Sequence, residues 1–213
     1  RGMRLVDVGA GTGQFAAALS DWFDLSVRAV EPSAAMRGQI PRTPAIQVLE
    51  GTASALRLPD ASADAAWLSL VLHHIPDLDV AAHEIRRVLR RGAPVLIRQG
   101  FPGRLDRVEL VRWFPETARA VDSYPSVDDT CKAFAAAGFH QDALEQVRET
   151  WPISLADFLG QLDTFRQADT TMRSLSEDEF LRGKERLRRA VRHAGDTANP
   201  EPRSNWLDLL VLR

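Results

Sequence analysis

The hydrophobic and polar positions of the chain fall into short blocks that predict strands alternating with helices. Brief apolar runs between turn residues indicate buried strands, and apolar residues spaced three or four apart indicate amphipathic helices. Strands and helices in this order favour a parallel, doubly wound sheet. In the first hundred residues these patterns predict strands at 5–8, 25–30, 45–49, 63–70 and 95–99, and helices at 13–22, 33–37 and 77–90.

The second half of the chain is richer in helical patterns. Helices are predicted at 105–114, 116–121, 127–137, near 155–167 and near 177–193, and strands at 143–150 and 206–212. We therefore predict a single α/β domain over residues 1–213. Its doubly wound, mostly parallel sheet has seven strands, the last of them antiparallel. A helical insertion at about 153–200 separates the last two strands.

A glycine string after the first strand is the clearest sign of ligand binding. The strand contains Asp7 and runs into Gly9, Gly11 and Gly13, and a helix follows. Such a turn directs backbone N–H groups toward a ligand. A dinucleotide fingerprint would place its third glycine where Gln14 stands, so the spacing argues against that class. The carboxylate of Asp7 would repel a pyrophosphate and suits a cationic ligand. A tight turn without a ligand is the alternative.

A second carboxylate, Glu31, ends the second predicted strand. Ligands of open α/β sheets bind at the carboxyl ends of the strands. A carboxylate at this place can accept hydrogen bonds from both ribose hydroxyls of an adenosine group, because it offers two acceptor oxygens. The alternative is a solvated glutamate that caps a short helix.

An ordered set of motifs extends this pattern to residues 5–99. It comprises the glycine string, Glu31, LRLPD at 56–60, LHHIPD at 72–77, EIRRVLRRG at 84–92 and the fifth strand. Together they closely resemble the S-adenosylmethionine-dependent methyltransferases with a Rossmann-like fold. Within this family, the motifs resemble the group of enzymes that act on small molecules, which includes the enzymes of ubiquinone and menaquinone biosynthesis. The AAAGF step at 135–139 also resembles these enzymes.

The resemblance implies a role for each matching position. Residues 1–100 would form the half that binds the cofactor, and 101–213 the acceptor side. The aminoacyl end of S-adenosylmethionine, and of the product S-adenosylhomocysteine, would be held by Asp7, Gly9, Ala10, Gly11 and Gly13. The remaining contacts would be Glu31 with the ribose, Pro32 and Ser33 beside it, Thr52 and Ala53 with the adenine, and Ser69 and Leu70 with the sulfonium. Many relatives place Asp where Thr52 stands, so the adenine contact is the weaker expectation.

Methyl transfer to an O, N or C atom requires mainly proximity and orientation, with a base only where the acceptor loses a proton. His73 and His74 follow the fourth strand, and His74 is the candidate base; capping or local packing is the alternative. Because the two are adjacent, we expect their rings to point apart. No third ligand is spaced to join them, so no metal site is predicted. Arg98 and Gln99 end the fifth strand, where Arg98 could bind an acidic acceptor or form a salt bridge.

Aromatic residues of the second half could either roof an acceptor pocket or form core, and core is the more common role. They are Trp113, Phe114, Tyr124, Trp151, Phe158 and Phe165. The basic stretch 181–193 could bind nucleic acid, but a solvated helix face is favoured because the net charge is −2.

Composition adds expectations about partners and location. With 45% hydrophobic and 26% charged residues, the chain is typical of a globular protein. No apolar run is long enough to span a bilayer, and the single Cys131 fits a reducing compartment, so we expect a cytoplasmic protein. Abundant Ala, with Arg in place of Lys, suggests a bacterial source. The expected partner is a small-molecule acceptor, with neither membrane nor nucleic acid, and the chain would be a monomer or homodimer.

Two other functions are compatible with the sequence. One is a binding or regulatory protein that keeps the cofactor fold without turnover, and the other is a nicotinamide-dependent oxidoreductase. The first strand also begins close to Arg1, where relatives often have a preceding segment that covers the cofactor. We therefore expect a truncated or partly disordered N-terminus, a site open on that side, and weak retention of the cofactor.

Overall fold

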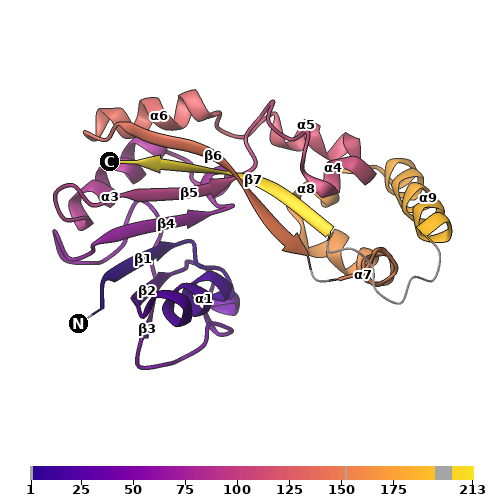
Figure 1. Cartoon of the computed structure of the whole chain (residues 1–213). Helices are drawn as coiled ribbons and strands as arrows, with labels where there is room; N and C mark the ends of the chain where they lie inside the picture. Colours follow the sequence, from indigo (N-terminus) through magenta and orange to yellow (C-terminus); the bar gives the residue numbers. More distant parts are fainter. Residues whose placement is uncertain (1, 152, 195–202) are drawn as a thin grey trace. The chain divides into compact units, whose positions relative to one another are not determined.

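The computed structural model describes residues 2–151, 153–194 and 203–213 and has an α/β fold (Figure 1). Its seven-stranded sheet has the order β3-β2-β1-β4-β5-β7-β6. The strands are β1 (Arg4–Val8), β2 (Ser26–Val30), β3 (Ile46–Leu49), β4 (Ala65–Ser69), β5 (Val95–Gln99), β6 (Gln141–Trp151) and β7 (Arg203–Leu212). The first five strands pair in parallel, and β7 runs antiparallel to β5. The predicted fold class is confirmed.

Helices connect most of these strands. They are α1 (Gln14–Phe23), α2 (Ala34–Arg37), the 3₁₀ turn η1 (Leu72–His74), α3 (Leu78–Val88), α4 (Glu109–Trp113), the 3₁₀ turn η2 (Pro115–Thr117), α5 (Ala118–Val121), α6 (Val127–Ala136), α7 (Leu155–Ala168), α8 (Thr170–Arg173) and α9 (Glu177–Ala194). As predicted, helices lie between β6 and β7; residues 195–200 of the expected insertion lie outside the described residues. None of the described helices is long and apolar enough to cross a membrane.

The fourth strand is shorter than the predicted range 63–70. At its start, Ala63 forms only an isolated bridge with Leu89. At its end, Leu70 has a φ of 53°, a left-handed conformation that turns the chain out of the strand. The sequence pattern alone does not reveal this turn, because leucine rarely adopts such a φ.

Both faces of the sheet near β1 are buried. The side chains of Leu5, Val27 and Ala29 point to the face that α1 covers, and Ala16 of α1 packs among them. Side chains alternate along a strand, so Val6 and Val8 point to the opposite face, and they are buried as well. The apolar runs of the sequence therefore correspond to strands covered on both sides.

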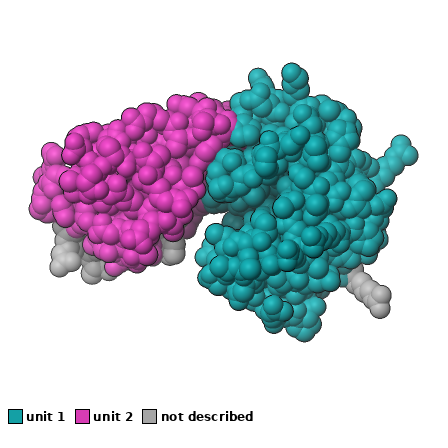
Figure 2. Space-filling model, turned by 180° about the vertical axis from the view of Figure 1, so that it is seen from behind, with its two compact units in different colours: residues 1–99, 125–145, 208–213 teal, residues 100–124, 146–207 magenta. Residues whose placement is uncertain are grey.

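The chain forms two compact units, which Figure 2 shows in different colours. Unit 1 consists of residues 1–99, 125–145 and 208–213 and contains the parallel strands with α1, α3 and α6. Helices α3 and α6 pack against each other. Unit 2 consists of residues 100–124 and 146–207 and contains α4, α5 and α7 to α9.

Unit 2 has its own apolar core. Three of the predicted aromatic residues, Trp113, Phe114 and Phe158, are buried in it, and Phe165 packs against it. The side chain of Trp151 lies outside the described residues. Helix α9 approaches the core closely at Gly183, where an added Cβ would lie 2.1 Å from the ring of Phe114. The aromatic pattern of this half is thus mainly a packing pattern.

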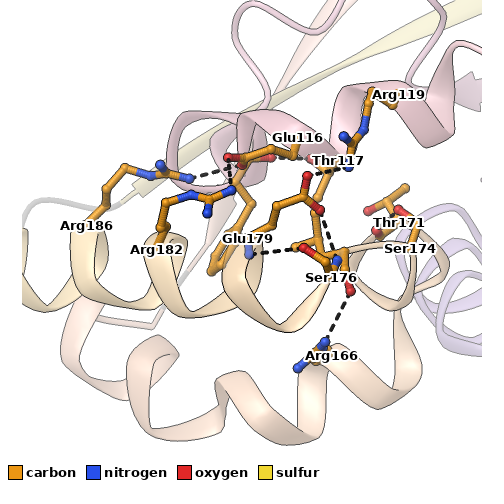
Figure 3. Close-up of polar contacts among 12 residues, drawn as sticks. Glu116, Thr117, Arg119, Arg166, Thr171, Ser174, Ser176, Glu179, Arg182 and Arg186 are labelled. Atoms are coloured by element: carbon orange, nitrogen blue, oxygen red, sulfur yellow. Dashed lines mark hydrogen bonds and ion pairs between the residues drawn. The ribbon is translucent and has the colours of Figure 1, made fainter.

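Ion pairs connect α9 to η2 and α5, as Figure 3 shows. Glu116 lies 3.1 Å from the guanidinium of Arg186 and 3.9 Å from that of Arg182. Arg186 also donates to the carbonyl oxygen of Trp113 at 2.8 Å, and Glu179 accepts from Arg119 at 2.8 Å. Much of the basic charge of α9 is therefore engaged with acidic side chains of the same unit.

Candidate functional site

The glycine string forms a tight turn between β1 and α1. The N–H groups of Gly9 and Ala10 both donate to the carbonyl oxygen of Val30, at 2.8 and 3.1 Å. Gly9 has a φ of 72°, and a Cβ at this position would lie 2.4 Å from a methyl group of Val71, so only glycine fits. Within this turn no side chain caps α1, which begins directly after Gly13. The first N–H groups of the helix are therefore placed to bind a ligand.

Glu31 joins the end of β2 to this turn. One carboxylate oxygen accepts from the N–H of Gly11 at 2.9 Å, and the other accepts from the N–H of Ser33 at 2.8 Å. Only 6% of Glu31 is exposed, so it is not a solvated helix cap. The cap of α2 is the hydroxyl of Ser33, which accepts from the N–H of Met36. Each oxygen of Glu31 has a second lone pair with which it can bind a ligand hydroxyl.

Arg37, at the end of α2, fixes the backbone around Glu31. Its guanidinium donates to the carbonyl oxygens of Glu31 and Pro32, at 2.9 and 2.5 Å, and to the carboxylate of Glu50 at 3.0 Å. Sequence reasoning assigned no role to Arg37, since a basic residue in the last turn of a helix is common.

Asp7 is the most unusual group of the site. It is 2% exposed, and its Oδ2 atom has no hydrogen-bond partner among the described residues. Burial first, and the charge of Glu31 second, raise the pKa of Asp7 from 3.8 to about 7. A buried carboxylate oxygen without a donor is costly unless a ligand supplies one. A cationic N–H donor, such as the ammonium of an amino acid, fits this position.

The turn that follows β3 carries Thr52 and Ala53. Thr52 and Ala55 exchange backbone hydrogen bonds of 3.2 and 3.0 Å across it. Thr52 is exposed and Ala53 half-buried. The next residues are held by α3: Glu84 accepts from the N–H of Leu56 at 2.8 Å, and its bond with Arg87 is the largest cause of its lowered pKa.

Ser69 is the last residue of β4, and Leu70 follows it. The hydroxyl of Ser69 accepts from the Nη1 of Arg98 at 2.9 Å, and Leu70 is 44% exposed. Arg98 and Gln99 are adjacent on β5, so their side chains point to opposite faces. Arg98 is half-buried, whereas Gln99 is 1% exposed. Of the two, Arg98 is therefore the one more exposed to solvent.

The expectation that the two histidine rings point apart is wrong. The ring centroids of His73 and His74 lie only 3.9 Å apart. Both residues belong to η1, where successive residues do not alternate as they do in a strand. His74 is exposed and His73 half-buried. In the part of the chain that the structure describes, no group of three or more His, Cys, Asp or Glu could hold a metal ion.

Two aromatic residues near the site were not singled out by the sequence. The rings of Phe15, in α1, and Trp67, in β4, have centroids 5.1 Å apart. The guanidinium carbon of Arg98 lies 5.0 Å from the Phe15 centroid. Trp67 is also the register partner of Asp7 on the neighbouring strand. Each looked like an ordinary core position in its apolar run, and only the strand pairing places Trp67 beside Asp7.

The predicted site residues thus lie at or just after the carboxyl ends of four neighbouring strands. Asp7, Gly11 and Glu31 come together directly at the glycine turn. In the sheet, β3, β2, β1 and β4 are adjacent in that order, and they lead to Thr52, Glu31, the glycine turn and Ser69. Because these strands are parallel, their carboxyl ends share one edge of the sheet.

Comparison with known proteins points to one family. Residues 6–97 match a family described as "Methyltransferase domain". The chain is 32% identical over 162 residues to O-methyltransferase rstn1 of Aspergillus nomiae, with 72% of each chain covered. It is 37% identical over 97 residues to the ubiquinone/menaquinone biosynthesis C-methyltransferase UbiE of Rubrivivax gelatinosus, which covers 45% of this chain but only 38% of that protein.

The solved structures agree on the fold. A protein of Anabaena variabilis that is described as a methyltransferase of an antibiotic biosynthesis pathway superposes with a TM-score of 0.71, covering all of this chain and 91% of that one. At 21% sequence identity this similarity concerns the fold alone.

Proposed function

Because the chain belongs to the family of S-adenosylmethionine-dependent methyltransferases, we propose that it transfers a methyl group from S-adenosylmethionine to an O, N or C atom of a small-molecule acceptor. The observation that carries the proposal is the pair of buried carboxylates, Asp7 and Glu31, at an uncapped helix start. One of them lacks a donor, which a cationic aminoacyl group supplies. The other has acceptor lone pairs for ribose hydroxyls.

The order of the strands supports the assignment of the remaining contacts. S-adenosylmethionine is a linear sequence of adenine, ribose, sulfonium and amino acid. The adenine would lie against Thr52 and Ala53, the ribose against Glu31 and Pro32, and the amino acid against Asp7 and the backbone of Gly9, Ala10, Gly11 and Gly13. Ser69 and Leu70, next to the glycine turn in the sheet order, would line the sulfonium side.

The bound cofactor would supply an activated methyl group, so this chain has to orient the acceptor and exclude competing water. His74 is the candidate base for an acceptor that must lose a proton. Its exposed position lets it exchange that proton with solvent. An acceptor that binds already ionised needs no such base.

Isothermal titration calorimetry with S-adenosylmethionine, S-adenosylhomocysteine and NADH tests the cofactor assignment. We expect both sulfur compounds to bind and NADH to fail. Glu31→Ala should weaken S-adenosylhomocysteine binding by about 1–3 kcal/mol, because charge-assisted hydrogen bonds are lost. Glu145→Ala, at an exposed position of the same unit, is the matched control and should leave binding unchanged. Binding of NADH alone would refute the proposal.

Turnover is tested with a panel of small acceptors bearing hydroxyl, amine or activated carbon groups. Formation of S-adenosylhomocysteine that depends on one acceptor would support the enzyme. Tight cofactor binding without transfer to any member of a broad panel would favour a non-catalytic binding protein.

A further inference from the structure

Four side chains form a strip along β4 and β5 on the sheet face that carries Asp7. They are Phe15, Trp67, Ser69 and Arg98, here called the β4–β5 strip. The strand register places them: Trp67 pairs with Asp7 across β1 and β4, and Ser69 pairs with Arg98 across β4 and β5. All four are half-buried, so the strip is partly open to solvent.

The strip combines flat apolar surface with hydrogen-bond donors and one positive charge. The two aromatic rings lie 5.1 Å apart at 44°, and the guanidinium of Arg98 lies 5.0 Å from one of them, that of Phe15. The indole Nε1 of Trp67 is buried and has no acceptor among the described residues. Guanidinium and indole N–H groups only donate hydrogen bonds, and arginine keeps its charge at every accessible pH.

This combination selects a particular ligand chemistry. Aromatic rings and a planar guanidinium favour a planar, aromatic partner. The positive charge and the indole donor favour an anionic oxygen group as hydrogen-bond acceptor. Ser69 of the strip is also the residue proposed to line the sulfonium side of the cofactor. The strip therefore borders the cofactor, where a methyl acceptor has to lie.

Resting on the function proposed above, we propose that the β4–β5 strip binds the methyl acceptor, and that this acceptor is an aromatic molecule carrying a carboxylate or another anionic oxygen group. The anionic group binds Arg98, and the ring lies against Phe15 and Trp67. Asp7, the register neighbour of Trp67, places this acceptor next to the aminoacyl end of the cofactor.

The experiment uses the full chain, labelled with ¹⁵N and saturated with S-adenosylhomocysteine. The chain has five tryptophans, and Trp67→Phe assigns the Trp67 indole signal in the correlation spectrum. The probes are 2-naphthoate and its neutral analogue 2-naphthamide. We expect naphthoate to shift the Trp67 signal saturably and to bind about tenfold more tightly than the amide, as for one charge-assisted contact.

Arg98→Met should abolish the preference for the anion, and Arg98→Lys should keep part of it. The control is Arg112→Met, because Arg112 also lies over an aromatic ring, 4.8 Å from the Trp113 centroid, but outside the strip. That variant should bind both probes as the wild type does. The naphthoate and naphthamide comparison on the wild type requires no variant, so a folding defect of Arg98→Met does not affect it.

Two failures can be told apart. If S-adenosylhomocysteine binds, but the Trp67 signal does not move or the two probes bind equally, the acceptor assignment is wrong and the proposed function stands. If S-adenosylhomocysteine does not bind, the proposed function itself fails.

Discussion

Replacing Asp7 with asparagine is expected to stabilise the ligand-free protein and to weaken its binding of the cofactor. The rise of the Asp7 pKa from 3.8 to about 7 corresponds to roughly 4 kcal/mol, since each pKa unit is worth about 1.4 kcal/mol. A raised folded-state pKa means that folding favours the protonated carboxyl. The free energy of unfolding is therefore unaffected by the ionisation of Asp7 below pH 3.8. It decreases as the pH rises from there to about 7, and it decreases no further above that pH.

Asparagine keeps the shape of the side chain without the charge. The gain in the free energy of unfolding for Asp7→Asn should thus grow by up to about 4 kcal/mol between pH 4 and pH 8. Comparing the two pH values cancels the cost of burying the amide, which is the same at both. Urea unfolding of wild type and variant, at several pH values without ligand, measures this difference.

The same ionisation should control cofactor affinity. With a pKa of about 7, roughly a tenth of Asp7 is ionised at pH 6 and about nine-tenths at pH 8. If the ammonium of the cofactor requires the ionised form, S-adenosylhomocysteine binds about tenfold more tightly at pH 8 than at pH 6. Asp7→Asn should bind more weakly and without this dependence. A wild-type affinity that is flat from pH 6 to 8, with unfolding of both proteins changing in parallel, would refute the reasoning.

Five further substitutions test the packing and one ion pair, and all are measured by thermal or urea unfolding. Gly9→Ala should lower the free energy of unfolding by about 2–4 kcal/mol, because the new Cβ overlaps a valine methyl and the φ is strained as well. Gly11→Ala meets nothing within 4 Å and should lower it by only about 1–2 kcal/mol. Equal losses would contradict the overlap. Gly183→Ala should destabilise by about 1–3 kcal/mol through its contact with an aromatic ring, whereas Gly160→Ala, in an open helix position, should stabilise by up to about 1. Glu84→Gln should lose about 1–2 kcal/mol near neutral pH. Because hydrogen bonding to Arg87 lowers the pKa of Glu84, that loss should shrink as the pH falls below 4.5, and a loss independent of pH would argue against the ion pair.

The sequence predicted those parts of the molecule that depend on local patterns. Strands β1, β2 and β5 were found because a strand covered on both faces reads as a short apolar run. Asp7 and Glu31 were found as site candidates because each interrupts or ends such a run near a turn. The structure brings these two together at Gly11.

The parts that were missed depend on contacts between distant segments. The role of Trp67 beside Asp7 requires the pairing of β1 with β4, which are about sixty residues apart. The close approach of the His73 and His74 rings depends on a 3₁₀ turn. That turn follows Leu70, whose left-handed backbone conformation the sequence does not predict, because leucine rarely adopts it. The role of Arg37 in holding two strand ends requires the placement of Glu50 directly after β3.

The position of β7 has a consequence for how the protein folds during synthesis. Residues 208–212 pair with β5, which leaves the ribosome roughly a hundred residues earlier. Until they arrive, the edge of β5 presents unpaired backbone groups, and at translation rates of about 5–20 residues per second this lasts for several seconds or more. The nascent chain is therefore exposed to wrong strand pairing throughout this interval. A short stretch fused after residue 213 that delays release of the chain from the ribosome should lower the yield of native protein more than an extension of equal length fused before residue 1.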